Sequence, residues 1–211
     1  VASWLPQTGV DLSGTTVTVS GSSKTVTGID FTGYRLINTG NNNIFEDCIG
    51  DFNTTGQTGN KRQWDIRGAN PTVRYCKITN PTPIGGVYGL ATFDATGTIT
   101  LDHNDVRDAA AQDVIAGPDV GGGSNVLIVT ETLIKGIHLT VGAHVDTIDG
   151  RGGAPGSTIS RNFIIGDKTP TSAPAGSGTG FTNAFHDLPT DPHGSPWNGW
   201  IIIENIIVGS D

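Results

Sequence analysis

The stretch that decides the fold runs from His144 to Ile164 and reads HVDTIDGRGGAPGSTISRNFI. It contains two short segments with the properties of strands and a glycine-rich corner between them. The first, around Ile148, alternates polar and apolar side chains, and the second, from Ile159 to Ile164, follows the pattern apolar-x-x-Asn-x-apolar. Repetition of such a unit at a fixed period is the signature of a repeat architecture.

The second segment has six matches along the chain. Their first positions are separated by 28, 28, 27, 31 and 43 residues, and the last two intervals contain Gly-, Pro- and Ser-rich insertions. The matches are Phe45-x-x-Cys48-x-Gly50, Val73-x-x-Cys76-x-Ile78, Leu101-x-x-Asn104-x-Val106, Ile128-x-x-Glu131-x-Leu133, Ile159-x-x-Asn162-x-Ile164 and Ile202-x-x-Asn205-x-Ile207. No interval carries a convincing run of apolar residues every three to four positions, so the pattern predicts strands without helices between them.

The first segment recurs as well, with an apolar residue between mostly polar neighbours. Its inward positions are Ile66, Phe93, Ile115, Ile148 and Phe185. Short strands at a fixed period predict an all-β fold, a right-handed parallel β-helix (solenoid) of about six to seven coils, with the six matched segments in one sheet. An Asn at one place in each coil can hydrogen-bond its counterparts in the coils above and below, and it tolerates left-handed turns.

The length of 211 residues predicts a single domain, 1–211. Residues 1–40 form an irregular N-terminal cap and first coil, 41–166 the regular coils, 167–199 loop insertions and 200–211 the last coil. The last strand, Trp200 to Val208, is the most apolar of the chain, and an uncovered apolar coil exposes strand edges. The chain also starts at Val1 without a methionine. We therefore expect a segment of a longer chain or of an assembly.

Composition narrows the function classes. The net charge of −8 argues against a nucleic-acid partner, which needs clustered Lys and Arg. No apolar stretch of 18 residues is present, so we expect no insertion into a membrane. The 31 glycines, against 15% charged residues, fit a chain of many tight corners better than a chain of helices.

The two cysteines occupy the same repeat position in successive coils. Coils of a parallel β-solenoid stack at about 4.8 Å, which is within the Cα separation of a disulfide. We expect Cys48 and Cys76 to be buried free thiols, since Cys is among the most buried residue types, with a disulfide as the alternative. Their spacing does not fit a zinc site.

One outer face of the predicted solenoid gathers polar residues. The position after the inward apolar residue holds Arg67, Asp94, Ala116, Asp149 and His186. Paired carboxylates on such a face can donate a proton and activate water, as in many polysaccharide hydrolases, so the alternative catalytic candidates are Asp94, Asp149, His186 and Asp146. A carboxylate cluster could equally hold Ca²⁺, although no cofactor is required.

A structural interpretation of these residues is favoured over catalysis. Asp and Asn beside glycine corners usually cap turns, and His144 with Asp146 is expected to tie one corner together. No catalytic residue is therefore assigned. The candidates for contact with a carbohydrate are Trp197, Arg67, Asp149 and Arg151, and Asp187 lies at the edge of the same face. Trp64 and Trp200 are expected to fill corner or core space.

The run HVDTIDGRGG, followed by a strand ending in RNFI, resembles a segment of the right-handed parallel β-helix repeat proteins of actinobacteria and of the tails of their bacteriophages. His144, Asp146, Ile148 and Asn162 match the segment, and GIDFTGYRLINTGNNNIFEDCIGD (28–51) is similar to the first coils of the same group. The resemblance covers about residues 28 to 165. It implies a β-helix of the pectate-lyase-like superfamily, whose members include enzymes and structural phage proteins.

Two functions follow from this resemblance. The first is a structural or host-binding module of a virion (tail, tail tip or fibre) that contacts a cell-surface polysaccharide or another virion subunit. The alternative is a polysaccharide-degrading enzyme, a lyase or a glycoside hydrolase. The chain has neither the Gly-His-Gly of polygalacturonases nor a recognisable lyase arginine cluster, which favours the first. We expect a virion or extracellular location and a homo-oligomer, with a trimer as the natural symmetric form.

Overall fold

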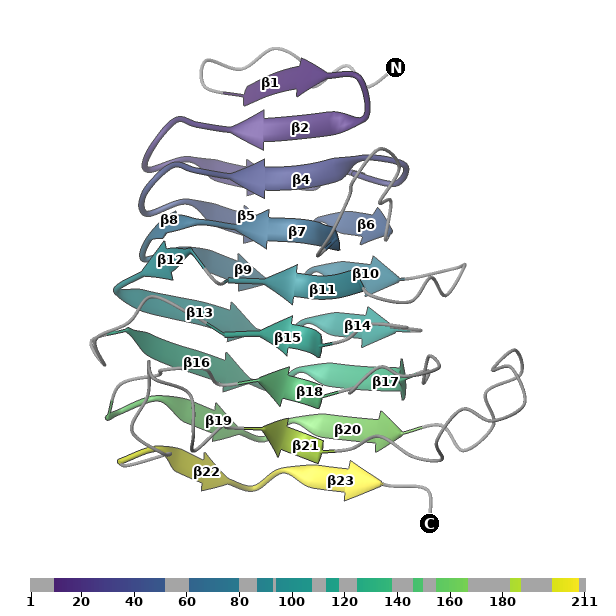
Figure 1. Ribbon diagram of the computed structural model, residues 1–211, viewed down its shortest axis with the longest axis vertical. Helices are drawn as coiled ribbons and strands as arrows, with labels where there is room; N and C mark the ends of the chain where they lie inside the picture. The colour runs from purple at the N-terminus through teal and green to yellow at the C-terminus, as the bar shows by residue number, and fades with distance from the viewer. Residues whose placement is uncertain are drawn as a thin grey trace.

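The computed structural model describes residues 10–51, 61–79, 87–92, 94–107, 113–117, 125–137, 146–149, 155–166, 183–186 and 199–208. Within these residues the chain is all-β and contains no helix. The strands form three long sheets and one two-stranded sheet. Successive coils lie one below the other from the N-terminus to the C-terminus (Figure 1). The prediction of an all-β fold with stacked parallel strands is confirmed.

Sheet A has eight strands and faces the viewer in Figure 1. Its strands are β1 (Val10–Ser13), β2 (Thr16–Val19), β4 (Arg35–Asn38), β7 (Lys61–Ile66), β11 (Val87–Ala91), β15 (Asp113–Ala116), β18 (Asp146–Asp149) and β21 (Asn183–His186). All neighbours pair in parallel except β1, which pairs with β2 as an antiparallel hairpin. This hairpin places Val10, 6% exposed, beside the fully buried Val19 at the N-terminal end of the core.

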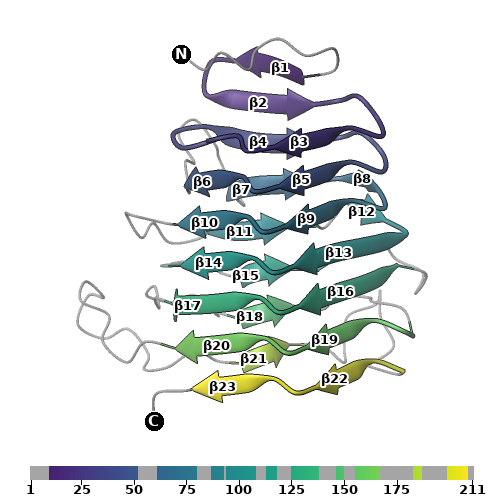
Figure 2. The ribbon, with the colours of Figure 1, turned by 180° about the vertical axis from the view of Figure 1, so that it is seen from behind.

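Sheets B and C lie on the opposite side of the molecule (Figure 2). Sheet B contains β3 (Thr25–Thr27), β5 (Ile44–Glu46), β9 (Thr72–Arg74), β13 (Thr98–Asp102), β16 (Val126–Thr130), β19 (Thr158–Ser160) and β22 (Ile201–Ile203). Sheet C contains β6 (Ile49–Asp51), β10 (Lys77–Thr79), β14 (Asp105–Arg107), β17 (Leu133–Ile137), β20 (Phe163–Gly166) and β23 (Ile206–Val208). A small fourth sheet pairs β8 (Gly68–Ala69) with β12 (Ala95–Thr96). Strand order within sheets B and C follows chain order, as expected when each coil adds one strand to each sheet.

The six matched segments do not form one sheet, because a bend divides each of them between sheets B and C. The residue at the bend has a left-handed backbone in every coil, with φ between 49° and 57°. The bend residues are Asp47, Tyr75, His103, Glu131, Arg161 and Glu204. Such a conformation is unfavourable for residues other than glycine, so the neighbouring coils must hold it in place.

An Asn ladder next to the bend links one coil to the next. The side-chain oxygen of Asn162 accepts a hydrogen bond from the backbone N–H of Thr132 at 3.0 Å, and its amide donates to the carbonyl of Val129 at 2.9 Å. Asn104 and Asn205 repeat the arrangement in other coils. The predicted role of Asn in linking coils is therefore confirmed, whereas the left-handed residue is the one before it.

The predicted register of the fourth coil is wrong by one residue. Leu101 pairs with Val129 and not with Ile128, and Val106 pairs with Ile134 and not with Leu133. The corrected intervals between ladder residues are 28 and 30 residues on the two sides of Thr132. At both places the two candidate residues are apolar, Ile128 and Val129 in one strand and Leu133 and Ile134 in the next, so hydrophobicity alone could not separate them.

Polar contacts explain the true register of this coil. Thr132 is buried, and its hydroxyl accepts a hydrogen bond from the backbone N–H of Asn104 at 3.3 Å, so Thr takes the place of Asn in the ladder. Glu131 lies at the exposed bend and contacts Arg161. A one-residue shift would exchange the inner and outer faces of the strand and bury Glu131.

The core is a set of stacked inward rows. In sheet A the row contains Val17, Leu36, Trp64, Leu90, Ile115 and Ile148. The prediction that Trp64 fills the core is confirmed, because it is fully buried and packs edge-on against Phe31 with ring centroids 5.7 Å apart. Trp200 is partly buried against the same core.

The cysteines are buried free thiols, as predicted. Ile49 and Lys77, the residues that follow the two cysteines, are strand partners, so the cysteines stack in neighbouring coils. The Cys76 thiol interacts with Cys48, and this contact together with burial raises the pKa of Cys76. The same contact lowers the pKa of Cys48.

Titration with a thiol reagent tests this state. We expect two reactive thiols per chain after unfolding without reductant, and almost none in the folded protein because Cys48 and Cys76 are at most 1% exposed. A count of zero after unfolding would show that a disulfide had formed.

Replacing a ladder residue tests the link between coils. Asn162→Ala leaves the Thr132 N–H and the Val129 carbonyl without their partner, and we expect a loss of about 1–3 kcal/mol in the free energy of unfolding. Asn162→Thr is the matched control, because Thr occupies this position in the preceding coil, and it should lose less. Denaturant unfolding compares the two, and an Ala variant as stable as wild type would contradict the ladder's role.

Candidate functional site

The predicted row of polar residues on sheet A is wrong in its first two coils. Trp64 and Leu90 occupy the inward row with Ile115 and Ile148, in place of Ile66 and Phe93. The outward row beside it is therefore Asp65, Ala91, Ala116 and Asp149, without Arg67 and Asp94, and the backbone of His186 pairs next to Asp149. Trp64 and Ile66 are two residues apart, and a two-residue shift keeps a side chain on the same face of a strand, so the alternation could not reveal that error. In the next coil Leu90 and Phe93 are three residues apart, so the predicted alternation was also wrong there.

Asp149 is fully buried on the outward side of β18. By strand register it lies beside His186 of β21, of which only the backbone is described. Two strands, β11 and β15, separate it from Asp65, so three spacings of about 4.8 Å place the two backbones about 14 Å apart. Glycosidase carboxyl pairs lie about 5–9.5 Å apart, so Asp65 and Asp149 do not match such a pair.

The other predicted site residues fall largely outside the described part of the chain. Only the backbone of Asp146 is described, in β18. His144, Arg151, Asp187 and Trp197 lie outside the described residues. Arg67 and Asp94 are described, and the structure brings these two together.

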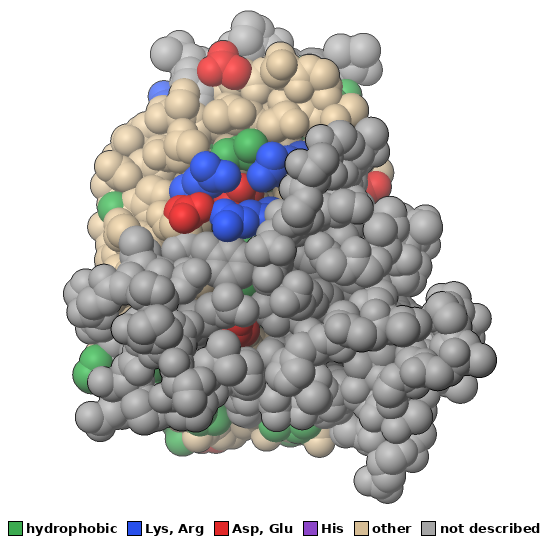
Figure 3. Space-filling view, viewed as in Figure 1, with side chains coloured by type: hydrophobic (Ala, Val, Ile, Leu, Met, Phe, Trp, Pro, Cys, Tyr) green, Lys and Arg blue, Asp and Glu red, His purple; other side chains and the backbone are tan. Residues whose placement is uncertain are grey.

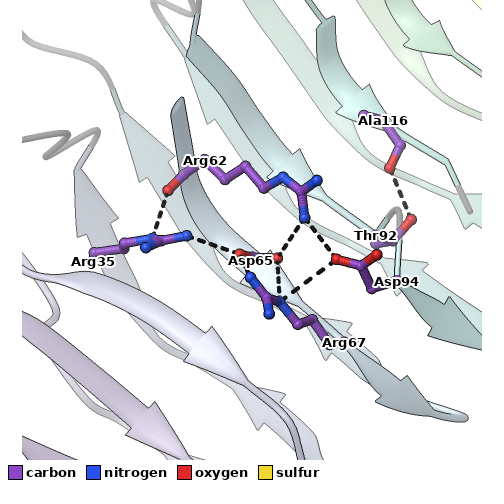
Figure 4. A network of polar contacts seen from close by, with 7 residues as sticks. All are labelled: Arg35, Arg62, Asp65, Arg67, Thr92, Asp94 and Ala116. Atoms are coloured by element: carbon purple, nitrogen blue, oxygen red, sulfur yellow. Dashed lines mark hydrogen bonds and ion pairs between the residues drawn. The ribbon is translucent and has the colours of Figure 1, made fainter. Parts of the chain in front are cut away.

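Arg67 and Asp94 belong to a cluster of five charged side chains on the outer face of sheet A. Its members are Arg35 from β4, Arg62 and Asp65 from β7, Arg67 just after β7, and Asp94 from the turn before β12. The arginines surround Asp65, and Asp94 lies beside Arg62 and Arg67 (Figure 4). We call this set the arginine cluster. In the space-filling view its blue and red atoms lie together at the surface (Figure 3).

Asp65 is the centre of the arginine cluster and is fully buried. Arg67 binds it with two nitrogens, Nε to Oδ1 at 3.0 Å and Nη2 to Oδ2 at 2.6 Å. Arg35 Nη2 donates to Oδ2 at 2.8 Å, and Arg62 Nη1 to Oδ1 at 3.3 Å. A buried carboxylate needs partners of this kind, because removal from water strongly disfavours an isolated charge.

The guanidinium groups sit at the boundary between the buried face and solvent. The Arg35 and Arg62 side chains are each 22% exposed and Arg67 is 38% exposed, whereas neighbouring outward residues such as Ala91 and Ala116 are fully buried. Partial burial lowers the pKa of Arg35, against the effect of Asp65, while the hydrogen bonds to Asp65 raise the pKa of Arg67. All three remain cations at neutral pH, since arginine does not lose its proton in proteins.

The cluster carries a net charge of +1, from three arginines and two aspartates, in a chain of net charge −8. A concentration of guanidinium groups on an acidic protein is suited to bind planar anions such as carboxylates, because arginine presents paired N–H donors. It is less suited to general acid catalysis, since Asp65 accepts from all three arginines.

Sequence reasoning missed Arg35, Arg62 and Asp65. The local signal was Arg62-Gln63-Trp64-Asp65-Ile66-Arg67, in which two inward apolar residues alternate with outward residues, so Asp65 must share a face with Arg67. The contribution of Arg35 depends on the register between β4 and β7, which the repeat pattern did not establish.

A second charged group follows the bend between sheets B and C. His103 contacts Asp102 through Nδ1 at 2.9 Å and Glu131 through Nε2 at 2.6 Å, and Arg161 contacts Glu131 at 2.8 Å. The Tyr75 ring lies over His103, with centroids 5.0 Å apart. The charged side chains of this group are 28–51% exposed, and surface ion pairs of this kind contribute little to stability.

Among the described residues, no group of three His, Cys, Asp or Glu side chains is placed to hold a metal ion. The Ca²⁺ site considered from the sequence stays a prediction. No helix of membrane-spanning length and hydropathy occurs in the part of the chain that the structure describes. Comparisons with protein-family models, curated proteins and solved structures find no match to this chain.

Removal of the central carboxylate tests the architecture of the arginine cluster. We expect Asp65→Asn to lower the free energy of unfolding by about 3 kcal/mol, at the low end for a buried ion pair because the arginines can regain hydration. Asp94→Asn is the control, and at an exposed pair it should cost less than about 1 kcal/mol. Equal losses in the two variants would contradict a central role for Asp65.

Proposed function

We propose that the chain is a right-handed parallel β-helix of about six to seven coils that works as a binding and spacing module without turnover. Parallel pairing, strand order that follows the chain, and the course of the ribbon in Figures 1 and 2 support this description. The right hand also agrees with the strong preference of parallel crossovers. An elongated stack of coils is suited to present a long, rigid lateral surface.

The arginine cluster is the observation that carries the proposed binding function. Three partly exposed guanidinium groups held by the buried Asp65 form a preorganised cationic site on sheet A. A site of this chemistry suits an acidic polysaccharide. Because the surrounding protein is acidic, the interaction depends on local charge and should weaken as salt is added.

The proposed setting is a bacteriophage virion, in a tail, tail tip or fibre, with cell-surface polysaccharide or another virion subunit as partner. This proposal rests on the resemblance of residues 28 to 165 and on the acidic charge of the chain. A virion or extracellular location belongs to the same proposal, as does the absence of a required cofactor.

The proposed homo-oligomer has support from exposed apolar side chains near the last coil. Those of β22 and β23 are 41–59% exposed. They are Ile201, Ile202, Ile203, Ile206, Ile207 and Val208. Burying one such side chain is worth about 1.5–3 kcal/mol, so we expect another subunit to cover them. A trimer is the symmetric form that the resemblance suggests.

The arginine cluster also favours one alternative, a polysaccharide lyase. Elimination next to a uronic acid needs a cation beside the substrate carboxylate, and Arg62 or Arg67 could supply it. The binding module is favoured because the described carboxylates of the cluster, Asp65 and Asp94, are both ion-paired to arginine.

Binding and cleavage are measured on the same samples. We expect wild-type protein to retain an acidic capsular or cell-wall polysaccharide without releasing oligosaccharides, and Arg62→Ala to bind about tenfold more weakly, a change of 1.4 kcal/mol. Arg107→Ala is the control, because Arg107 is an exposed arginine paired with Asp105 on sheet C. Circular dichroism confirms that both variants fold. Released unsaturated or reducing oligosaccharides would establish the enzyme instead, and equal binding by all three proteins would remove the cluster from the site.

A further inference from the structure

Asp94 differs from the other carboxylate of the arginine cluster in position and exposure. Asp65 belongs to a strand and is fully buried, whereas Asp94 lies in the turn before β12 and its side chain is 55% exposed. Its Oδ2 atom contacts Arg62 Nη1 at 2.8 Å and lies 3.7 Å from Arg67 Nε. Asp65 thus holds the arginines of the cluster from the buried side, and Asp94 contacts Arg62 and Arg67 from the solvent side.

The same guanidinium groups serve both carboxylates. Arg62 Nη1 contacts Asp65 at 3.3 Å and Asp94 at 2.8 Å, so the inner carboxylate orients the nitrogen that the outer one binds. Figure 4 shows the Asp94 carboxylate beside the guanidinium groups of Arg62 and Arg67. An external anion would have to reach these two groups from solvent, where Asp94 lies.

We infer that the Asp94 carboxylate occupies the place of a ligand carboxylate, so that an acidic sugar binds the arginine cluster by displacing it. Asp94 is then an internal competitor that lowers affinity for weak anions and keeps the guanidinium groups paired when no ligand is bound. The exchange breaks no covalent bond, only the hydrogen bond and ion pair between Asp94 and Arg62, and an exposed ion pair of this kind is weak. This inference rests on the proposed binding function and adds the regulation of its site.

Neutralising Asp94 tests the exchange. The probe is an oligosaccharide of alternating glucuronate and N-acetylglucosamine, and its carboxyl-reduced form is the neutral control. We expect Asp94→Asn to bind the acidic probe about tenfold more tightly than wild type, equivalent to 1.4 kcal/mol, with no gain for the reduced probe. Titration calorimetry at low and at physiological ionic strength measures both.

A matched variant separates local competition from a change of net charge. Asp105→Asn removes the same charge from a carboxylate that is also paired with an exposed arginine, Arg107, but on sheet C. It should leave the affinity at the wild-type value. A gain equal to that of Asp94→Asn would overturn the inference, because the effect would then come from total charge.

The remaining outcomes separate this inference from the proposed function. Wild-type binding that Asp94→Asn leaves unchanged or weakens would overturn the competitor role and leave the binding function standing. Tighter binding of a sulfated neutral-sugar oligosaccharide than of the glucuronate probe would overturn the assignment to a carboxylate. No binding of any anionic probe by wild type or by Asp94→Asn would overturn both proposals.

Discussion

The structure depends on hydrogen bonds between coils at the bend that divides sheets B and C. Each bend places a residue other than glycine in the left-handed region, a conformation that is stable only when its surroundings hold it. The Asn104, Thr132, Asn162 and Asn205 side chains satisfy backbone groups beside that bend in the preceding coil. Since every ladder residue bonds to a neighbouring coil, the bend and the stacking of coils stabilise each other.

On sheet A, the buried Asp65 carboxylate requires ion-pair partners. The outward face of sheet A near Asp65 is buried, and a carboxylate there would be strongly unfavourable without partners. Three arginines supply them, one from β4 and two from β7 and its end, so neighbouring coils are joined by charge as well as by backbone pairing. The need to pair a buried carboxylate therefore places guanidinium groups at the surface, and the proposed binding role uses the same atoms as the structural one.

The sequence was sufficient for the all-β fold, the parallel stacking and the burial of Cys48, Cys76 and Trp64, because these follow from period and from hydrophobicity. It failed where two positions were equally apolar, as at Ile128 and Val129, or where a two-residue shift kept the same face, as at Trp64 and Ile66. The arginine cluster was missed for the same reason. Contacts between charged residues of different coils can be predicted only when the strand register is known. Periodicity indicates which face of a strand a residue occupies, but not which residue of the next coil lies beside it.

At the bend between sheets B and C, the backbone conformation does not depend on the type of side chain. Its backbone is nearly the same in six coils, yet the residues there are Asp, Tyr, His, Glu, Arg and Glu. Their main-chain hydrogen bonds do not depend on the side chain, as in the pairs from Tyr75 to Asp102 and from His103 to Thr130. A coil inserted or deleted would lengthen or shorten this row by one side chain, at a step of about 4.8 Å, without changing the geometry of the others. The side chains along the bend can thus change without a change of fold, and the length of their row is set by the number of coils.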